Sequence, residues 1–523
     1  MRIEHRLFPV LPRARRSATI AALLTMLALI PAAHAEEPLS AIDWLSQSVS
    51  TPAAVEPTQE APVSAGVVQE NVSVSVIGAP SADAVGLLSS QVTGLPTNLW
   101  GPGRSAEIVA AIGAERIDSL PALRGLLLTL LLAEADPPAD AGGAGALLTA
   151  RIDKLLDMGA LDQARALLDA AGSRDPGLFR RSFDVALLTG EEDRGCRTMV
   201  ESPGLAPTFP ARIFCLARSG DWNAAALTLR TGQALGYITD EEDALLSRFL
   251  DPDLYEGEGA LPTPDRVTPL AWRMFEAIGE PLSTATLPIA FAHAELRPSA
   301  GWKAQVEAAE RLARAGAISS NMLLGLYTER SPAASGGVWD RVEAFQAFDD
   351  TLTNGTPEAV AQALPGIWAQ MTMAELEVPF ADLYGRRLSQ MALPDPAHQT
   401  AFAIGLLSPD FETIAAARTA ADPREAFLIG LAKGDVAGLA PPDTLARAIA
   451  PAFVGHEPSE DLSRLMAENR IGEAILAAIE EIERGVQGDL DGVTDGLTLL
   501  RDVGLERAAR RTALELMLLE RRG

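Results

Sequence analysis

The chain has 523 residues and a formal net charge of −27 at pH 7, because 70 acidic residues outnumber 43 basic ones. An acidic surface repels nucleic acid and anionic lipid, so both are excluded as expected partners. The length allows about two to four domains or one long repeat array.

Residues 1–35 have the pattern of a secretory signal peptide. Arginines precede an apolar run at 18–30, and the Ala-His-Ala sequence at 33–35 supplies the small residues that signal peptidase requires. We expect cleavage before Glu36; an uncleaved membrane anchor is the alternative. Because lysine is rare and arginine abundant, as in GC-rich bacterial genes, the expected compartment is the periplasm.

Residues 36–50 predict a short amphipathic helix, followed by a Pro-rich linker at 51–70. Ile42 and Leu45 share the apolar face of this helix, with Trp44 beside them. A tethered helix with a tryptophan is typical of a docking peptide, so these three side chains are candidate contacts with an envelope protein or peptide. Packing of the helix onto its own domain is an equally good interpretation.

Residues 71–103 contain the one clear strand signal. At 71–78, valine alternates with serine at a period of two, which predicts a short strand. The strand could pair within its own segment or add to a partner's sheet. The sequences PLSAIDWLSQSVS, NVSVSVIG and TGLPTNLWG also resemble secreted alphaproteobacterial proteins labelled antifreeze glycopeptide-like. This resemblance implies secretion and no activity.

From residue 104 onward, one helical period follows another. The run at 123–135 is apolar but too short to cross a bilayer, so it predicts a buried core helix. Several turns share a pattern in which Gly or Asn is followed by alanine five positions later. The glycine or asparagine predicts a left-handed helix cap, and the alanine predicts close packing of the next helix. The pairs are Gly159 and Ala164, Gly220 and Ala225, Asn469 and Ala474, and Gly504 and Ala509.

The spacing of these turns indicates a repeat. Gly159, Gly190 and Gly220 are 31 and 30 residues apart, and Asn469 and Gly504 are 35 apart, which is the period of stacked helical hairpins. On these turns the chain resembles the tetratricopeptide-repeat (TPR) superfamily. The resemblance implies an all-α solenoid, with one repeat arm at 104–250, a turn-rich break at 251–266 and a second arm at 267–523.

The two cysteines lie in consecutive predicted helices, at 191–202 and 211–220. Helices joined by a short loop run antiparallel, so Cys196 and Cys215 should lie level with each other. In an oxidising compartment this placement predicts a disulfide, and a buried reduced pair is the alternative. The spacing differs from Cys-x-x-Cys and no histidine is close in sequence, so redox catalysis and zinc binding are both disfavoured.

Motifs for catalysis are missing from the sequence. It has no HExxH, no Gly-x-Ser-x-Gly elbow and no Walker loop. The segment 488–496 resembles a calcium loop but lacks the required glycine and closing glutamate, so a capped surface loop is expected there. We therefore expect no cofactor and no metal site.

The function that these patterns predict is a secreted periplasmic scaffold for protein–protein interaction, without enzymatic activity. The alternative is an enzyme or enzyme subunit of the cell envelope that acts on peptidoglycan through an acidic site hidden among the many carboxylates. The partner and the oligomeric state are left open by the sequence.

Overall fold

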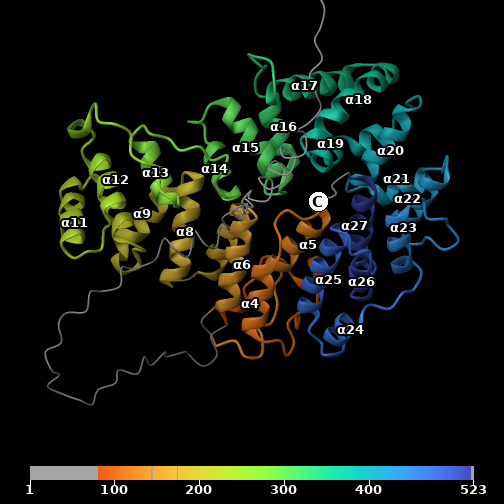
Figure 1. The fold of residues 1–523 in the computed structure, drawn as a ribbon, viewed down its shortest axis with the longest axis horizontal. Helices are drawn as coiled ribbons and strands as arrows, with labels where there is room; N and C mark the ends of the chain where they lie inside the picture. The colour runs from red at the N-terminus through yellow and green to blue at the C-terminus, as the bar shows by residue number, and fades with distance from the viewer. Residues whose placement is uncertain (1–80, 143–144, 173–174, 520–523) are drawn as a thin grey trace, which may run out of the picture. The chain divides into compact units, whose positions relative to one another are not determined.

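The structure is a computed structural model that describes residues 81–142, 145–172 and 175–519. In this part of the chain the regular elements are helices (Figure 1), and the β-bridge between Leu88 and Ala133 is isolated. The predicted all-α class is therefore confirmed for the described residues. The predicted signal peptide, the docking helix and the strand at 71–78 lie outside the described residues.

The first helices bury the apolar run that the sequence predicted as core. Helix α5 has Leu123, Leu127, Leu130 and Leu131 almost fully buried, and a proline at its first position fits the helix start. A short 3₁₀ helix, η1 (Ala82–Ala84), precedes this group. Its α-helices are α3 (Ser90–Thr93), α4 (Ser105–Ala114), α5 (Pro121–Leu132), α6 (Ala146–Asp157) and α7 (Leu161–Ala171).

The predicted turns adopt the predicted conformation. The residue that ends the first helix has a positive φ in each: 72° at Gly159, 86° at Gly220, 60° at Asn469 and 84° at Gly504. The alanine five positions later is fully buried in each: Ala164, Ala225, Ala474 and Ala509. A left-handed cap followed by a small buried residue thus joins consecutive antiparallel helices.

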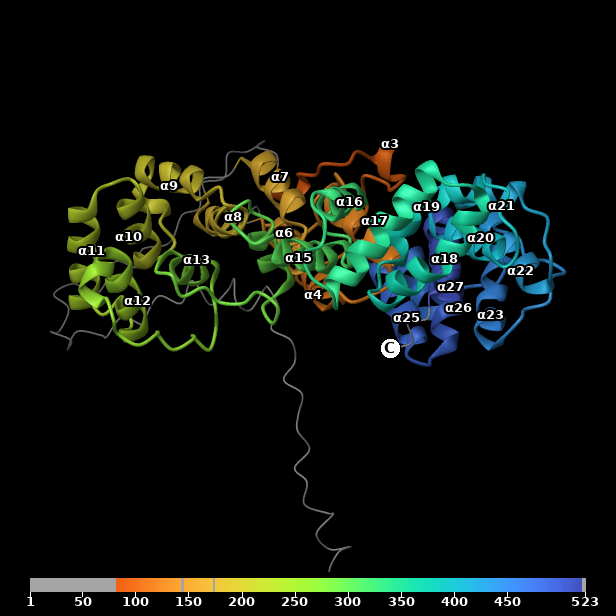
Figure 2. The same ribbon diagram turned by 90° about the horizontal axis from the view of Figure 1, so that it is seen from above.

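The next six helices form a hydrophobic core of their own, and we call them the lateral group. Figures 1 and 2 both show α9–α13 gathered away from α17–α27. The short 3₁₀ helices η2 (Pro203–Leu205) and η3 (Pro252–Tyr255) lie within it. Its α-helices are α8 (Pro176–Thr189), α9 (Glu192–Glu201), α10 (Phe209–Arg218), α11 (Trp222–Ala234), α12 (Asp240–Leu250) and α13 (Pro269–Ala277).

The turn-rich break at 251–266 does not separate two cores. Helix α13, which follows the break, packs on α8 and α12 and contributes Leu270, Met274 and Phe275 to the core of the lateral group. Helices α4–α7 instead share the main core with the helices that follow the lateral group. The core of the lateral group thus includes helices on both sides of the break, and the arms at 104–250 and 267–523 stay a prediction.

The helices after the lateral group complete the main core. Two further 3₁₀ helices, η4 (Ile289–Phe291) and η5 (Ala450–Phe453), lie among them. The first part is α14 (Ala292–Glu295), α15 (Trp302–Arg314), α16 (Ser320–Thr328), α17 (Val338–Asn354), α18 (Pro357–Met373), α19 (Glu377–Ser389) and α20 (Ala397–Leu407). The second part is α21 (Phe411–Ala417), α22 (Pro423–Lys433), α23 (Thr444–Ile449), α24 (Glu460–Ala467), α25 (Ile471–Val486), α26 (Leu490–Asp502) and α27 (Glu506–Leu518).

Helices near the two ends of the described residues pack against each other. Helix α4 contacts α25, and α5 contacts α27, so the two ends of the described array meet (Figure 1). The backbone N–H of Ala122 donates to the Glu515 carboxylate at 2.7 Å. The N–H of Gly472 donates to the Leu99 carbonyl at 2.8 Å. We call this contact between α4–α5 and α25–α27 the closure seam.

The structure corrects one local prediction. Most of the segment 488–496, expected to be a surface loop, belongs to helix α26, in which Val493 is fully buried. A Cβ atom on Gly496 would lie 2.6 Å from the Ala478 carbonyl oxygen of α25. Gly492 and Gly496 therefore allow close packing of α26 against α25, whereas Gly488 lies in the turn before α26 with a φ of 127°.

A helix that crosses a bilayer needs about twenty predominantly apolar residues. None of the helices within the described ranges is long and apolar enough to cross a bilayer.

Candidate functional site

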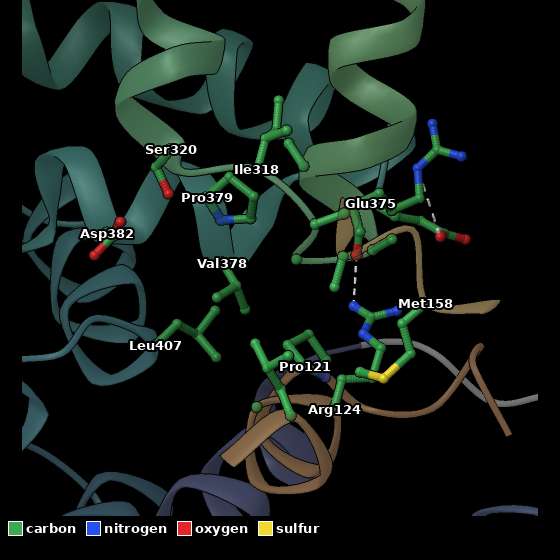
Figure 3. A pocket seen from close by; sticks show the side chains of 18 of the residues that line it. Pro121, Arg124, Met158, Ile318, Ser320, Glu375, Val378, Pro379, Asp382 and Leu407 are labelled. Carbon is green, nitrogen blue, oxygen red and sulfur yellow. Dashed lines mark hydrogen bonds and ion pairs between the residues drawn. The ribbon is translucent and has the colours of Figure 1, made fainter. Parts of the chain in front are cut away.

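A cavity of about 250 Å³ lies where α5, the α6–α7 turn, the α15–α16 turn, α19 and α27 come together. We call it the closure cavity, because α5 and α27 belong to the closure seam. Side chains from distant parts of the sequence line it (Figure 3): Pro121, Arg124, Met158, Ile318, Ser320, Glu375, Val378, Pro379, Asp382 and Leu407.

The floor of the closure cavity is apolar. Val378, Leu407 and Pro121 point toward one another across the cavity (Figure 3). Leu407 is buried, and Gly125 of α5 leaves open space at the wall, because a Cβ atom there would meet nothing within 4 Å. An apolar floor with open space can accept an apolar side chain of another molecule.

Guanidinium groups hold the walls of the closure cavity together. Arg124 is buried and donates to the backbone carbonyl of Arg314 at 2.5 Å. Arg314 in turn donates to the carbonyl of Ala374 at 3.0 Å and lies 4.0 Å from the Glu375 carboxylate. This chain of contacts links α5 to α15 and to the α18–α19 turn, so it fixes the positions of three walls.

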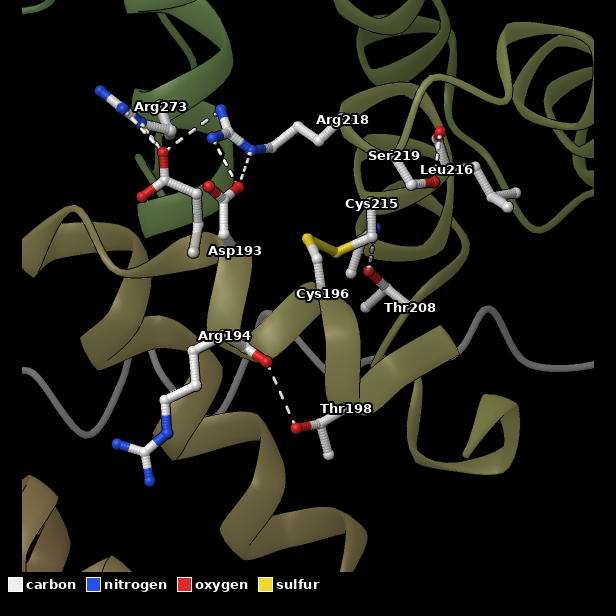
Figure 4. The surroundings of a disulfide bond; sticks show 12 residues. Asp193, Arg194, Cys196, Thr198, Thr208, Cys215, Leu216, Arg218, Ser219 and Arg273 are labelled. Carbon is white, nitrogen blue, oxygen red and sulfur yellow. Dashed lines mark hydrogen bonds and ion pairs between the residues drawn. A yellow bond between two sulfur atoms is a disulfide. The ribbon is translucent and has the colours of Figure 1, made fainter. Parts of the chain in front are cut away.

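The cysteines lie level on α9 and α10, as the sequence predicted. Their sulfur atoms are 1.98 Å apart and their Cα atoms 5.0 Å apart, which is disulfide distance (Figure 4). Cys196 is 5% exposed and Cys215 is 2% exposed. A buried pair of this kind joins two helices of the lateral group and offers solvent no reactive thiol.

Ion pairs beside the cysteines extend the same link to α13. Glu192 is buried, and its carboxylate lies 2.8 Å from Arg273 of α13 and 3.3 Å from Arg218 of α10. Arg218 also lies 2.7 Å from Asp193 (Figure 4). The surroundings of Cys196 and Cys215 therefore fit a structural role within the lateral group.

Two buried carboxylates lie on helices that meet at the closure seam. Glu115 ends α4, and Glu483 belongs to α25. Burial, together with the negative charge of Glu483, raises the pKa of Glu115 to about 8. Burial also raises the pKa of Glu483 to about 7. Neither residue lines the closure cavity. These are the described groups that come nearest to the acidic pair which the enzyme alternative requires.

The sequence predicted only part of these sites. The candidate partner contacts Ile42, Trp44 and Leu45 lie outside the described residues. The closure cavity was not predicted, because its lining comes from segments between Pro121 and Arg511 that meet only in three dimensions. Among the described residues, no three His, Cys, Asp or Glu side chains are grouped as metal ligands.

Comparison with known proteins finds no relative. No protein-family model, no curated protein and no solved structure matches the chain.

Proposed function

We propose that the chain is a periplasmic TPR-like scaffold that binds an apolar segment of another envelope protein in the closure cavity and catalyses no reaction. One observation carries the proposal: several helix ends converge on one open, apolar-floored cavity whose walls are fixed by Arg124 and Arg314. A preformed cavity of this kind binds without a large ordering cost. The cysteine pair at disulfide distance is compatible with an oxidising compartment.

The binding site can be tested by photo-crosslinking in the cell envelope. A photoreactive residue replaces Asp382, which is exposed at the edge of the closure cavity, or Leu254 on η3, which is 70% exposed and far from that cavity in sequence. We expect the Asp382 position to give an adduct with one protein, through an apolar segment identified by mass spectrometry. The Leu254 position should give no such adduct.

A matched pair of variants shows whether the adduct depends on the cavity. Gly125→Trp should fill the closure cavity without disturbing α5, because a side chain there meets open space. Gly113→Trp on α4 is the control, since it is equally open and does not line the cavity. Loss of the adduct in the first variant and retention in the second is the expected result. Adducts that persist in Gly125→Trp would overturn the proposal.

The enzyme alternative has its own test. If the purified protein turns over peptidoglycan, and if Glu115→Gln abolishes this activity while the folded state persists, the scaffold proposal is wrong. The raised pKa of Glu115, about 8, would then suit this carboxyl group to general acid catalysis. We expect no turnover.

A further inference from the structure

A second cavity, of about 420 Å³, lies within the lateral group between α8, α10, α12 and α13. We call it the lateral cavity. Its floor carries Arg180 and Asp184 of α8, and one wall carries Phe209 and Tyr237. None of the residues that line it also lines the closure cavity.

The floor of the lateral cavity contains a buried guanidinium group that forms an ion pair with Asp184 and has two nitrogen atoms without a hydrogen-bond partner among the described residues. Arg180 is 7% exposed and Asp184 is 5% exposed. The guanidinium Nε lies 3.8 Å from Asp184 Oδ2, which exceeds hydrogen-bond distance. Nε and Nη2 of Arg180 and Oδ2 of Asp184 have no hydrogen-bond partner among the described residues.

The adjacent arginine on the same helix shows the contrast. Arg181 donates to both oxygens of Asp153, at 2.5 and 2.7 Å, and to the Gly177 carbonyl at 3.0 Å. A buried charged donor without such partners is costly, and it is expected chiefly where a ligand completes the contacts.

Three helix N-termini open onto the same cavity. Helices α10, α12 and α13 begin directly after Thr208, Thr239 and Thr268, and all three threonines line the lateral cavity. Each threonine accepts a hydrogen bond from a backbone N–H of its helix through its side-chain oxygen. At α12 a capping box also brings the Glu242 carboxylate to the N–H and the hydroxyl of Thr239, so only Thr208 and Thr268 keep a hydroxyl hydrogen to donate. The positive end of a helix dipole favours a nearby anion.

The charges around the cavity favour an anion over a cation. Arg180 and Arg212 face it, together with the three helix N-termini. Asp184 and Glu242 oppose them, but burial raises the pKa of Asp184 to about 7 and raises that of Glu242. At neutral pH the negative charge of Asp184 is therefore reduced, while the guanidinium charge remains.

The remaining walls require an apolar group on the ligand. The rings of Phe209 and Tyr237 are stacked with centroids 5.0 Å apart, and the buried side chains of Phe183, Leu245 and Met274 line the cavity beside them. A small inorganic anion would leave this apolar surface unfilled.

We propose that the lateral cavity binds an organic carboxylate with an apolar or aromatic substituent. The carboxylate contacts Arg180 and the N-termini of α10 and α13, and the substituent packs against Phe209 and Tyr237. Two sources offer this chemistry: the C-terminus of an apolar peptide and a free aromatic acid. The site is additional to the closure cavity and does not depend on the function proposed for that cavity.

Calorimetry with four probes tests the ligand class on the full chain. N-acetylphenylalanine and the peptide acetyl-Ala-Ala-Phe both carry the required carboxylate, whereas N-acetylphenylalaninamide lacks it and inorganic phosphate lacks the apolar substituent. We expect at least one acid to bind, and the amide to bind about tenfold more weakly or not at all. Tighter binding of the peptide identifies a C-terminus as the source, and tighter binding of the single residue identifies a free acid. Equal binding of acid and amide overturns the proposal, as does binding of inorganic phosphate alone.

Two variants of the cavity floor give effects of opposite sign. Arg180→Gln should weaken binding of the acid by about tenfold or more, because the guanidinium is lost. Asp184→Asn should strengthen it by about threefold to tenfold, because the competing carboxyl group is removed. Arg197→Gln, at an exposed position of α9, should leave the affinity unchanged. A weaker affinity in Asp184→Asn would contradict the proposal, and this test does not require the Arg180 variant to fold.

Discussion

Single residues decide where the helices of this chain turn and how closely they pack. Glycine is required at two kinds of position: where the backbone adopts a positive φ, as at Gly159, and where helices touch, as at Gly496. Other glycines, such as Gly125 within α5, meet neither condition, because φ is helical and the space beside the Cα atom is open. The same substitution should therefore have opposite effects at different glycines.

Gly159→Ala should lower the free energy of unfolding by about 1–2 kcal/mol, because alanine is strained at a φ of 72°. The added Cβ would also lie 3.1 Å from Ile289. Gly125→Ala should raise the free energy of unfolding by about 0.5–1 kcal/mol, because alanine favours a helix. Urea unfolding of both variants checks the pair. Stabilisation at position 159 would contradict the left-handed cap.

At the scale of elements, the sequence predicted helices and turns well and missed contacts between distant segments. The pairing of a left-handed residue with a buried alanine could be predicted because both lie in one hairpin. The helical structure of most of segment 488–496 could not be predicted from the sequence. The glycines within the helix serve the packing of α26 against α25, which only the folded chain reveals. The residues that line the closure cavity carry no local signal for the same reason.

The lateral cavity could be predicted from the sequence only in part. Its three threonine N-caps could have been found locally, because each precedes a helix with proline or acidic residues in its first turn: Thr208, Thr239 and Thr268. What the sequence could not show is that three separate helix starts face one buried arginine, Arg180. Convergence of helix ends depends on the packing of α8, α10, α12 and α13.

The link between α9 and α10 gives a prediction at this scale. Replacement of Cys196 and Cys215 by alanine should lower the free energy of unfolding by about 3 kcal/mol, because the bond closes a loop between residues 19 apart in the sequence. Reductant should lower the stability of the wild-type protein by a similar amount and leave the variant unaffected. A wild-type protein that is insensitive to reductant, with two free thiols by mass spectrometry, would show that the pair is reduced.

At the scale of the whole described molecule, the closure seam joins helices from the two ends of the described residues. Helices α4 and α5 cover α25 and α27, so neither end leaves an apolar face uncovered at this contact. The seam also carries charge. Arg470 lies 2.5 Å from Glu473 three residues later and 2.9 Å from the exposed Glu107 across the seam. The buried atoms Glu115 Oε2 and Glu483 Oε1 have no hydrogen-bond partner among the described residues.

The buried carboxyl groups of the seam make the stability of the protein depend on pH. Burial raises the pKa of Glu115 from 4.5 to about 8 and that of Glu483 to about 7, so the folded state holds protons that the unfolded state releases. Stability from these groups is fully present below pH 4.5 and is lost as the pH rises to about 8. Carboxyl groups with a lowered pKa, such as Glu276 beside Arg297, stabilise the folded state in their charged form. This contribution to stability is lost when they become protonated at acidic pH. We therefore expect maximum stability in mildly acidic solution.

Thermal unfolding between pH 5 and pH 8.5 tests whether the seam causes this dependence. Glu115→Gln and Glu483→Gln should each reduce the fall in melting temperature across this range. An amide stays neutral at every pH in the range, so its burial does not become more costly as the pH rises. The exposed Asp491→Asn of α26 serves as the control and should keep the wild-type slope. If the two seam variants keep the wild-type slope as well, the pH dependence arises elsewhere, with the buried Asp184 of the lateral cavity as the next group to replace. If they flatten it, the closure seam is the pH-sensitive part of the fold.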